Sequence, residues 1–144
     1  MGAVTNMRPD LFKVVIAGVP FVDVMTTMSD ASIPLTTGEW EEWGNPNESK
    51  YHEYMLTYSP LDNIRRQPYP HVLMIAGLHD PRVAFWEPAK WAAKLREYST
   101  STSDVLLKLD MEVGHFSASD RYKYLKEKAF EQAYVLSKIT KSTS

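Results

Sequence analysis

The chain has 144 residues, of which 44% are hydrophobic and 24% charged, and its formal net charge is -2. This length suits one domain with a sizeable buried core, and a near balance of charge without a clustered basic face argues against nucleic acid as a partner. The sequence contains no cysteine, which excludes disulfides and thiolate zinc sites and fits the cytoplasm, where we expect the protein to be.

The chain opens with a short segment that predicts the tail of a helix, closed by Pro9. Residues Lys13 to Gly18 then form a continuous apolar run rich in β-branched side chains, which predicts a strand buried on both faces. The longest apolar stretch, Val14 to Val22, is interrupted by Pro20 and is far shorter than the roughly 20 residues of a membrane span. We therefore expect no membrane partner.

The rest of the chain alternates helical and strand patterns. Residues 20–60 are mostly irregular, with short helices expected at 23–28 and 48–58, and an excursion of this length is typical of a segment that builds a site. Strands are predicted at 70–77 and 104–110, and helices at 88–98 and 120–139. This alternation predicts an α/β fold with about three parallel strands and flanking helices. So few strands leave an edge unpaired, which favours self-association.

Two residues lie just beyond the carboxyl ends of predicted strands, where parallel sheets form their sites. Asp80 follows the strand that ends at Gly77, and His115 follows the strand that ends at Asp110. An Asp and then a His at the same end of a sheet match the last two members of the Ser, Asp, His order of α/β-hydrolases. Spacing alone leaves an alternative open, in which Asp80 caps the next segment and His115 sits in a turn.

The other histidines, His52, His71 and His79, show no metal-ligand spacing, so we assign them structural roles. An acidic cluster precedes them at Glu39, Glu41 and Glu42. It has a structural interpretation, because Thr36 with Glu39 fits a capping box and acids in a first helical turn interact favourably with the helix dipole.

Longer stretches carry a more specific signal than spacing, because they follow one another in register over nearly the whole chain. They are Gly18-Val-Pro-Phe-Val-Asp-Val-Met, Ile33-Pro-Leu-Thr-Thr-Gly-Glu-Trp-Glu-Glu-Trp-Gly-Asn-Pro46, Tyr58-Ser-Pro-Leu-Asp-Asn63, Gly77-Leu-His-Asp-Pro-Arg-Val83, Trp86-Glu-Pro-Ala-Lys-Trp91, Lys94-Leu-Arg96 and Gly114-His115-Phe. In these stretches the sequence closely resembles the prolyl oligopeptidase family of serine peptidases, in its oligopeptidase B branch.

The resemblance implies the catalytic domain of a cytosolic endopeptidase that cleaves short peptides after arginine or lysine, with a propeller domain over the site. Asp80 and His115 then correspond to the acid and base of the triad, and Arg82 to an arginine that holds a substrate carbonyl. The structural alternative for Arg82 is a surface salt bridge. No metal or organic cofactor is implied, since a triad supplies both nucleophile and proton transfer. Another α/β-hydrolase, such as an esterase or an acylaminoacyl peptidase, remains an alternative with the same Asp and His.

The resemblance also gives the acidic cluster a function. Glu39, with Glu41 beside it, would line the pocket for the basic side chain before the cut, because a carboxylate meets a guanidinium through two parallel bonds. In prolyl-specific relatives the position of Glu39 carries an aromatic residue that packs the proline ring. Glu41 shares a face with Glu39 only if the segment is extended, since residues two apart on a helix point away from each other.

One family motif does not occur in the sequence. The nucleophilic serine belongs to a Gly-x-Ser-x-Gly-Gly elbow, and none of the serines here has that setting. By the resemblance, Met1 falls in the helix that follows the elbow. We therefore expect a piece of a longer protein, residues 1–144 forming a partial catalytic domain without elbow or propeller. Alone, this piece should be inactive as a peptidase, or it should act as a non-catalytic module that binds basic peptides. The partners we expect are short basic peptides and the missing upstream half of the protein.

Overall fold

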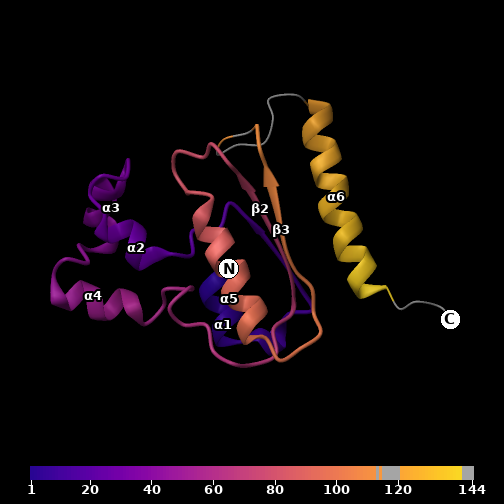
Figure 1. The fold of residues 1–144 in the computed structure, drawn as a ribbon, viewed down its shortest axis with the longest axis horizontal. Helices are drawn as coiled ribbons and strands as arrows, with labels where there is room; N and C mark the ends of the chain where they lie inside the picture. Colours follow the sequence, from indigo (N-terminus) through magenta and orange to yellow (C-terminus); the bar gives the residue numbers. More distant parts are fainter. Residues whose placement is uncertain (113, 115–120, 141–144) are drawn as a thin grey trace.

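The sheet that organises the chain has three parallel strands in the order β1-β2-β3 (Figure 1). The computed structural model describes residues 1–112, 114 and 121–140. β1 spans Val14–Gly18, β2 spans His71–Gly77 and β3 spans Val105–Asp110, each beginning one residue later than the sequence predicts. Both neighbouring pairs are parallel. The predicted α/β class, with three parallel strands and flanking helices, is confirmed.

Helices lie close to where apolar periodicity predicts them, and α3 is the one whose form the sequence left open. Gly44 ends α3 with a φ of 92°, and a β-carbon at this position would lie 2.2 Å from Cδ1 of Tyr51, so only glycine fits. The capping box is not formed, because Leu35 precedes the helix and the Thr36 hydroxyl donates to the Thr27 carbonyl. The helices are α1 (Gly2–Met7), a 3-10 turn (Pro9–Leu11), α2 (Val24–Ser29), α3 (Thr36–Trp43), α4 (Ser49–Leu56), α5 (Trp86–Tyr98) and α6 (Arg121–Ile139).

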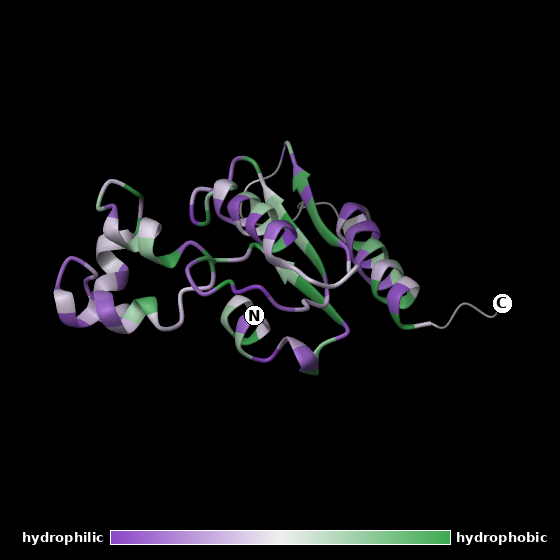
Figure 2. Cartoon of the chain, turned by 60° about the horizontal axis from the view of Figure 1, so that its bottom comes forward, coloured by the Kyte–Doolittle hydropathy of each residue, from purple (hydrophilic) through white to green (hydrophobic). Residues whose placement is uncertain are grey.

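The main core lies between the sheet and α5, while α6 lies against the opposite face of the sheet (Figures 1 and 2). Trp91 and Leu95 on α5 are fully buried, and Tyr98 packs against the same core, as their helical spacing predicts. From β2, Val72 and Met74 meet them with no exposed surface. Among the residues that the structure describes, no helix is both long and apolar enough to cross a membrane.

The burial of β1 differs from the prediction of a strand covered on both faces. Val15 and Ala17 are buried, but Val14 and Ile16 are only half-buried and Gly18 is exposed. The lower burial follows from the position of β1 at an edge of the sheet, where it has a neighbouring strand on one side. β2 is the central strand and has the nearly continuous burial that a strand covered on both faces requires.

The free edge of β1 leads to a prediction about association. Within the described part of the chain β1 pairs with β2 alone, so its other side presents backbone N–H and C=O groups that can pair with another strand. We expect the isolated chain to self-associate, with an apparent mass in light scattering that rises with protein concentration. A monodisperse monomer over the same concentration range would contradict this expectation.

A second, smaller core holds α2, α3 and α4 together as a lobe to the left of the sheet in Figure 1. Its buried centre consists of Val24, Met25, Met28 and Met55. Four half-buried aromatic side chains pack around this centre: Phe21, Trp40, Trp43 and Tyr58.

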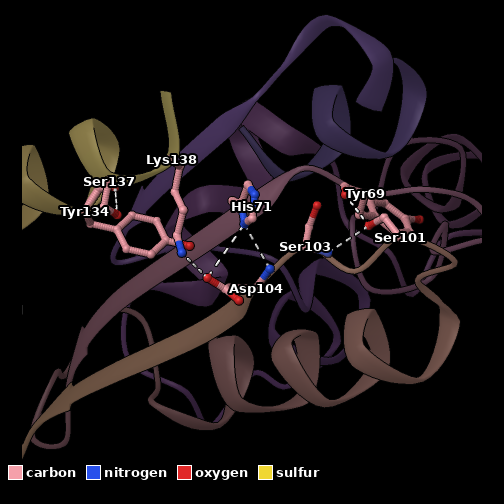
Figure 3. Close-up of polar contacts among 8 residues, drawn as sticks. All are labelled: Tyr69, His71, Ser101, Ser103, Asp104, Tyr134, Ser137 and Lys138. Carbon is pink, nitrogen blue, oxygen red and sulfur yellow. Dashed lines mark hydrogen bonds and ion pairs between the residues drawn. The ribbon is translucent and has the colours of Figure 1, made fainter. Parts of the chain in front are cut away.

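Charged side chains attach α6 at both ends of β3. Lys123 pairs with Asp110 at 3.2 Å, and Lys138 pairs with Asp104, the residue before β3. Figure 3 shows Asp104 between Lys138 and His71. The Asp104 backbone N–H also donates to Nδ1 of His71 at 3.0 Å, which fixes this ring nitrogen as an acceptor.

This geometry predicts how stability changes with pH. Burial lowers the pKa of His71 below the ordinary histidine value of about 6.5, and the nearby Asp104 opposes this only in part. Because the unfolded chain then takes up the proton first, the free energy of unfolding should fall as the pH drops from about 6.5 through the lowered pKa. His71→Asn keeps an acceptor without a proton to gain, so urea unfolding of this variant should depend less on pH in that window. Equal pH dependence in both proteins would contradict the assignment.

Candidate active site

Asp80 lies in a tight turn three residues beyond the end of β2. It is 9% exposed, and its Oδ1 accepts the backbone N–H groups of Arg82 at 2.8 Å and Val83 at 3.0 Å. These bonds orient the carboxylate with one oxygen committed to the turn. The buried, oriented carboxylate is the form that an acid needs if it is to hold an imidazole in one tautomer.

Gly114, four residues after the end of β3, lies beside the Asp80 turn. Gly77 and Asp110 are partners in the register of β2 and β3, so these neighbouring strands end side by side. Further along, Gly114 packs against the turn, because a β-carbon at this position would lie 3.4 Å from the backbone oxygen of His79. His115, the predicted base, lies outside the described residues. The chain therefore passes beside the Asp80 turn one residue before it reaches His115.

Glu39 lines a cavity of about 220 Å³ between the lobe and the Asp80 turn. The walls are mostly apolar, and Arg82 and Glu39 are the charged residues that line it. A mostly apolar cavity with few charged groups is typical of a site for a side chain with an apolar stem and a charged head. The other described residues that line it are Phe21, Thr27, Met28, Pro34, Leu35, Thr36, Trp43 and Val83.

Glu41 is not brought together with Glu39, contrary to what the extended form of the segment would give. Both lie on α3, and residues two apart on a helix are about 200° apart around its axis. Glu41 accordingly does not line the cavity that Glu39 lines. Because the segment is helical, the arrangement that would let both acids share one pocket is absent.

Arg82 lies between this cavity and the Asp80 turn. It lines the cavity of Glu39, and it also lines a neighbouring hollow of about 260 Å³ that includes Asp80. Thr27 and Pro34 belong to both hollows as well. The candidate acid, the candidate carbonyl-binding arginine and the candidate pocket acid therefore lie along one continuous surface.

Glu87, which was not predicted as a site residue, is buried behind this surface and bonds to the segment that forms part of it. Its carboxyl has no exposed area, and it accepts the N–H groups of Val22 at 2.8 Å and Asp23 at 2.9 Å and the hydroxyl of Thr27 at 2.7 Å. Burial raises the pKa of Glu87, and the three donors oppose the rise. Lys90, one turn later on α5, pairs with the buried Asp23 at 2.6 Å. Glu87 thus fixes the segment that carries Thr27 of the cavity wall.

The remaining histidines occupy structural or solvent-facing positions. His52 lies on α4 with its Nδ1 3.2 Å from the Pro46 carbonyl oxygen, and His79 is exposed beside Asp80. Over residues 1–112, 114 and 121–140, no group of three or more His, Asp or Glu side chains is arranged to hold a metal ion.

Sequence reasoning missed Glu87 and Trp43, although a signal exists for each. Glu87 is four and eight residues before Trp91 and Leu95, so it lies on the buried face of α5 and its burial follows from helical spacing. Trp43 is four residues after Glu39, a spacing that places both on one face once the segment is recognised as a helix.

Comparison with known proteins now defines the class of this domain. The Prolyl oligopeptidase family matches residues 1–142, and the chain belongs to that family. More particularly, it is similar to oligopeptidase B from Leishmania major, at 70% identity and a TM-score of 0.93, and from Trypanosoma brucei, solved with covalently bound antipain, at 72% identity and a TM-score of 0.92. It is also 50% identical over 139 residues to Protease 2 of Moraxella lacunata. The predicted resemblance is confirmed.

The matches cover most of this chain but a small share of each relative. They include 95% of this chain and 19% of each oligopeptidase B structure, and 96% of this chain and 20% of Protease 2. The chain thus corresponds to the C-terminal part of a catalytic domain of the oligopeptidase B kind, and it spans about a fifth of the length of these relatives.

Proposed function

We propose that this chain supplies the acid, the base and the specificity pocket of a serine peptidase that cleaves short peptides after arginine or lysine. Asp80 is the acid that orients the imidazole, and His115 is the base that takes the proton from the serine and returns it to the leaving amine. The nucleophilic serine comes from the part of the relatives' length that this chain does not span. Alone, the chain has no peptidase activity.

The observation that carries this proposal is the cavity shared by Glu39 and Arg82, next to the hollow that contains Asp80. The apolar walls accept the aliphatic stem of a basic side chain, and the Glu39 carboxylate receives its charged head. Arg82 lines both hollows. It therefore lies between the pocket for the basic side chain and the scissile bond, close to where a carbonyl of the substrate backbone would be. Its guanidinium donates to that carbonyl.

The proposal predicts a loss of activity in Glu39→Gln. The assay uses an exchange protein, in which this chain replaces the matching segment of Leishmania major oligopeptidase B, to which it is 70% identical. Because a hydrogen bond to a charged group contributes about 1.5–3 kcal/mol, Glu39→Gln should lower kcat/KM for an arginyl amide roughly ten- to a hundredfold. The measured quantity is the initial rate of hydrolysis of the arginyl amide.

The matched control is Glu42→Gln on the same helix, since Glu42 is exposed and does not line the cavity. It should leave kcat/KM for the arginyl amide within about twofold, as surface substitutions usually do. If Glu39→Gln and Glu42→Gln had equal effects, the pocket would be wrongly placed.

A second candidate function rests on the apolar cavity with the Glu39 carboxylate at its wall. We propose that the isolated chain binds basic peptides without cutting them. A titration with acetyl-arginine amide followed by NMR should show saturable binding in the unaltered chain, and Glu39→Gln should weaken this binding roughly ten- to a hundredfold. Binding that Glu39→Gln left unchanged would place the ligand elsewhere.

A further inference from the structure

One polar contact in the cavity is made by Trp43, the last residue of α3. Its indole Nε1–H donates to Oε2 of Glu39 at 3.1 Å. The two residues are one helical turn apart, so the helix itself keeps them adjacent. Glu39 is exposed while Trp43 is half-buried, and the contact therefore links a side chain free to move in solvent to one held by the lobe.

The Trp43 ring is itself fixed by other aromatic rings. The Phe21 ring meets it edge-on, with centroids 5.7 Å apart and planes at 78°, and the Tyr58 ring lies 6.4 Å away. Both partners pack against the small core of the lobe. The edge-to-face contact with Phe21 has a preferred geometry, so packing against Phe21 restricts the direction of the indole N–H independently of its bond to Glu39.

An oriented carboxylate has different consequences for the two basic side chains. A guanidinium is planar and binds a carboxylate through two parallel bonds, which requires that both oxygens lie in the plane of the fork. An ammonium is a compact point charge that can approach either oxygen from many directions. A donor that holds one Glu39 oxygen restricts the rotation of the carboxylate, and this restriction favours arginine over lysine.

We propose that Trp43 is a positioning residue that presets the Glu39 carboxylate for a guanidinium and so determines the preference for arginine over lysine. The proposal rests on the proposed function, in which Glu39 receives the basic side chain. Trp43 acts through Glu39 and packs within the lobe.

The test is Trp43→Phe, which keeps an aromatic ring against Phe21 and Tyr58 but removes the N–H donor. Binding of acetyl-arginine amide and of acetyl-lysine amide to the chain is measured by NMR titration. Trp43→Phe should weaken arginine amide binding about three- to tenfold, as expected for loss of one hydrogen bond, and lysine amide binding by less than twofold. A fall in the arginine to lysine ratio is a result that loss of packing alone would not give.

Two controls make the result specific. Trp40→Phe removes an indole N–H from the same helix, but that N–H donates to the Met28 carbonyl at 2.9 Å, so the ratio should not change. In a Glu39→Gln background, Trp43→Phe should have no further effect on either ligand, because the two residues form one unit.

The outcomes separate this proposal from the proposed function. If the unaltered chain prefers arginine amide and Trp43→Phe lowers that preference, the positioning role is supported. If the unaltered chain binds both amides and Trp43→Phe weakens both equally or neither, the positioning role is wrong and the pocket stands. If the unaltered chain binds neither amide, the pocket itself is wrong and the role of Trp43 falls with it.

Discussion

Replacing Glu87 with alanine is expected to lower the free energy of unfolding of the chain by about 3–5 kcal/mol, because it leaves buried hydrogen-bond donors without an acceptor. Three donors lose their acceptor at once, namely the N–H groups of Val22 and Asp23 and the Thr27 hydroxyl. None of them can reach water easily, since all three residues are buried. Urea unfolding followed by circular dichroism measures the loss.

Glu87→Gln is the matched variant, because it keeps the shape of the side chain. Both backbone N–H groups donate to the same carboxyl oxygen, Oε2, so an amide oxygen can accept both. The amide nitrogen can then donate to the Thr27 oxygen in place of the bond to Oε1. We expect this variant to lose about 1 kcal/mol. If glutamine and alanine were equally destabilising, the network would not be the source of the effect.

In the exchange protein, Asp80→Asn should lower kcat roughly ten-thousandfold, the size of effect seen when the buried acid of a Ser-His-Asp triad becomes an amide. The physical reason is that an amide nitrogen beside the imidazole favours the wrong tautomer. Asn retains an oxygen for the Arg82 and Val83 N–H groups, so the turn itself should persist. Hydrolysis of an arginyl amide under single-turnover conditions reads out the chemical step.

Asp80→Ala separates the turn from the chemistry. It removes the acceptor for both N–H groups and should therefore lower stability as well as activity, whereas Asp80→Asn should leave the urea midpoint nearly unchanged. An Asp80→Asn enzyme within tenfold of the unaltered exchange protein would remove Asp80 from the proposed triad.

Much of the fold could be predicted from the sequence because its signals are local. Each strand is a short, mostly apolar run, and α5 shows its buried face through the spacing of Trp91, Leu95 and Tyr98. The same reasoning overestimated the burial of β1, because an apolar run does not reveal whether a strand is central or at an edge. That depends on pairing between distant segments.

The candidate site was only partly predictable for a related reason. Asp80 could be located because it follows a strand end, and the sequence motifs pointed to Glu39 and Arg82. Whether Glu41 joins Glu39 depended on the local structure of residues 36–43, where Gly38 weakens the helical pattern and leaves the choice to tertiary packing. The roles of Glu87 and Trp43 depend on contacts with residues 21–27 and 39, which only the folded chain brings into place.

The most direct test of the account is the peptidase activity of the unaltered exchange protein, measured beside the isolated chain. If this chain supplies the acid, base and pocket, the exchange protein should hydrolyse an arginyl amide with a kcat/KM within about tenfold of the Leishmania major enzyme, and prefer it over a prolyl amide. The isolated chain should hydrolyse neither. A folded exchange protein without activity toward the arginyl amide, or cleavage by the isolated chain alone, would contradict the account.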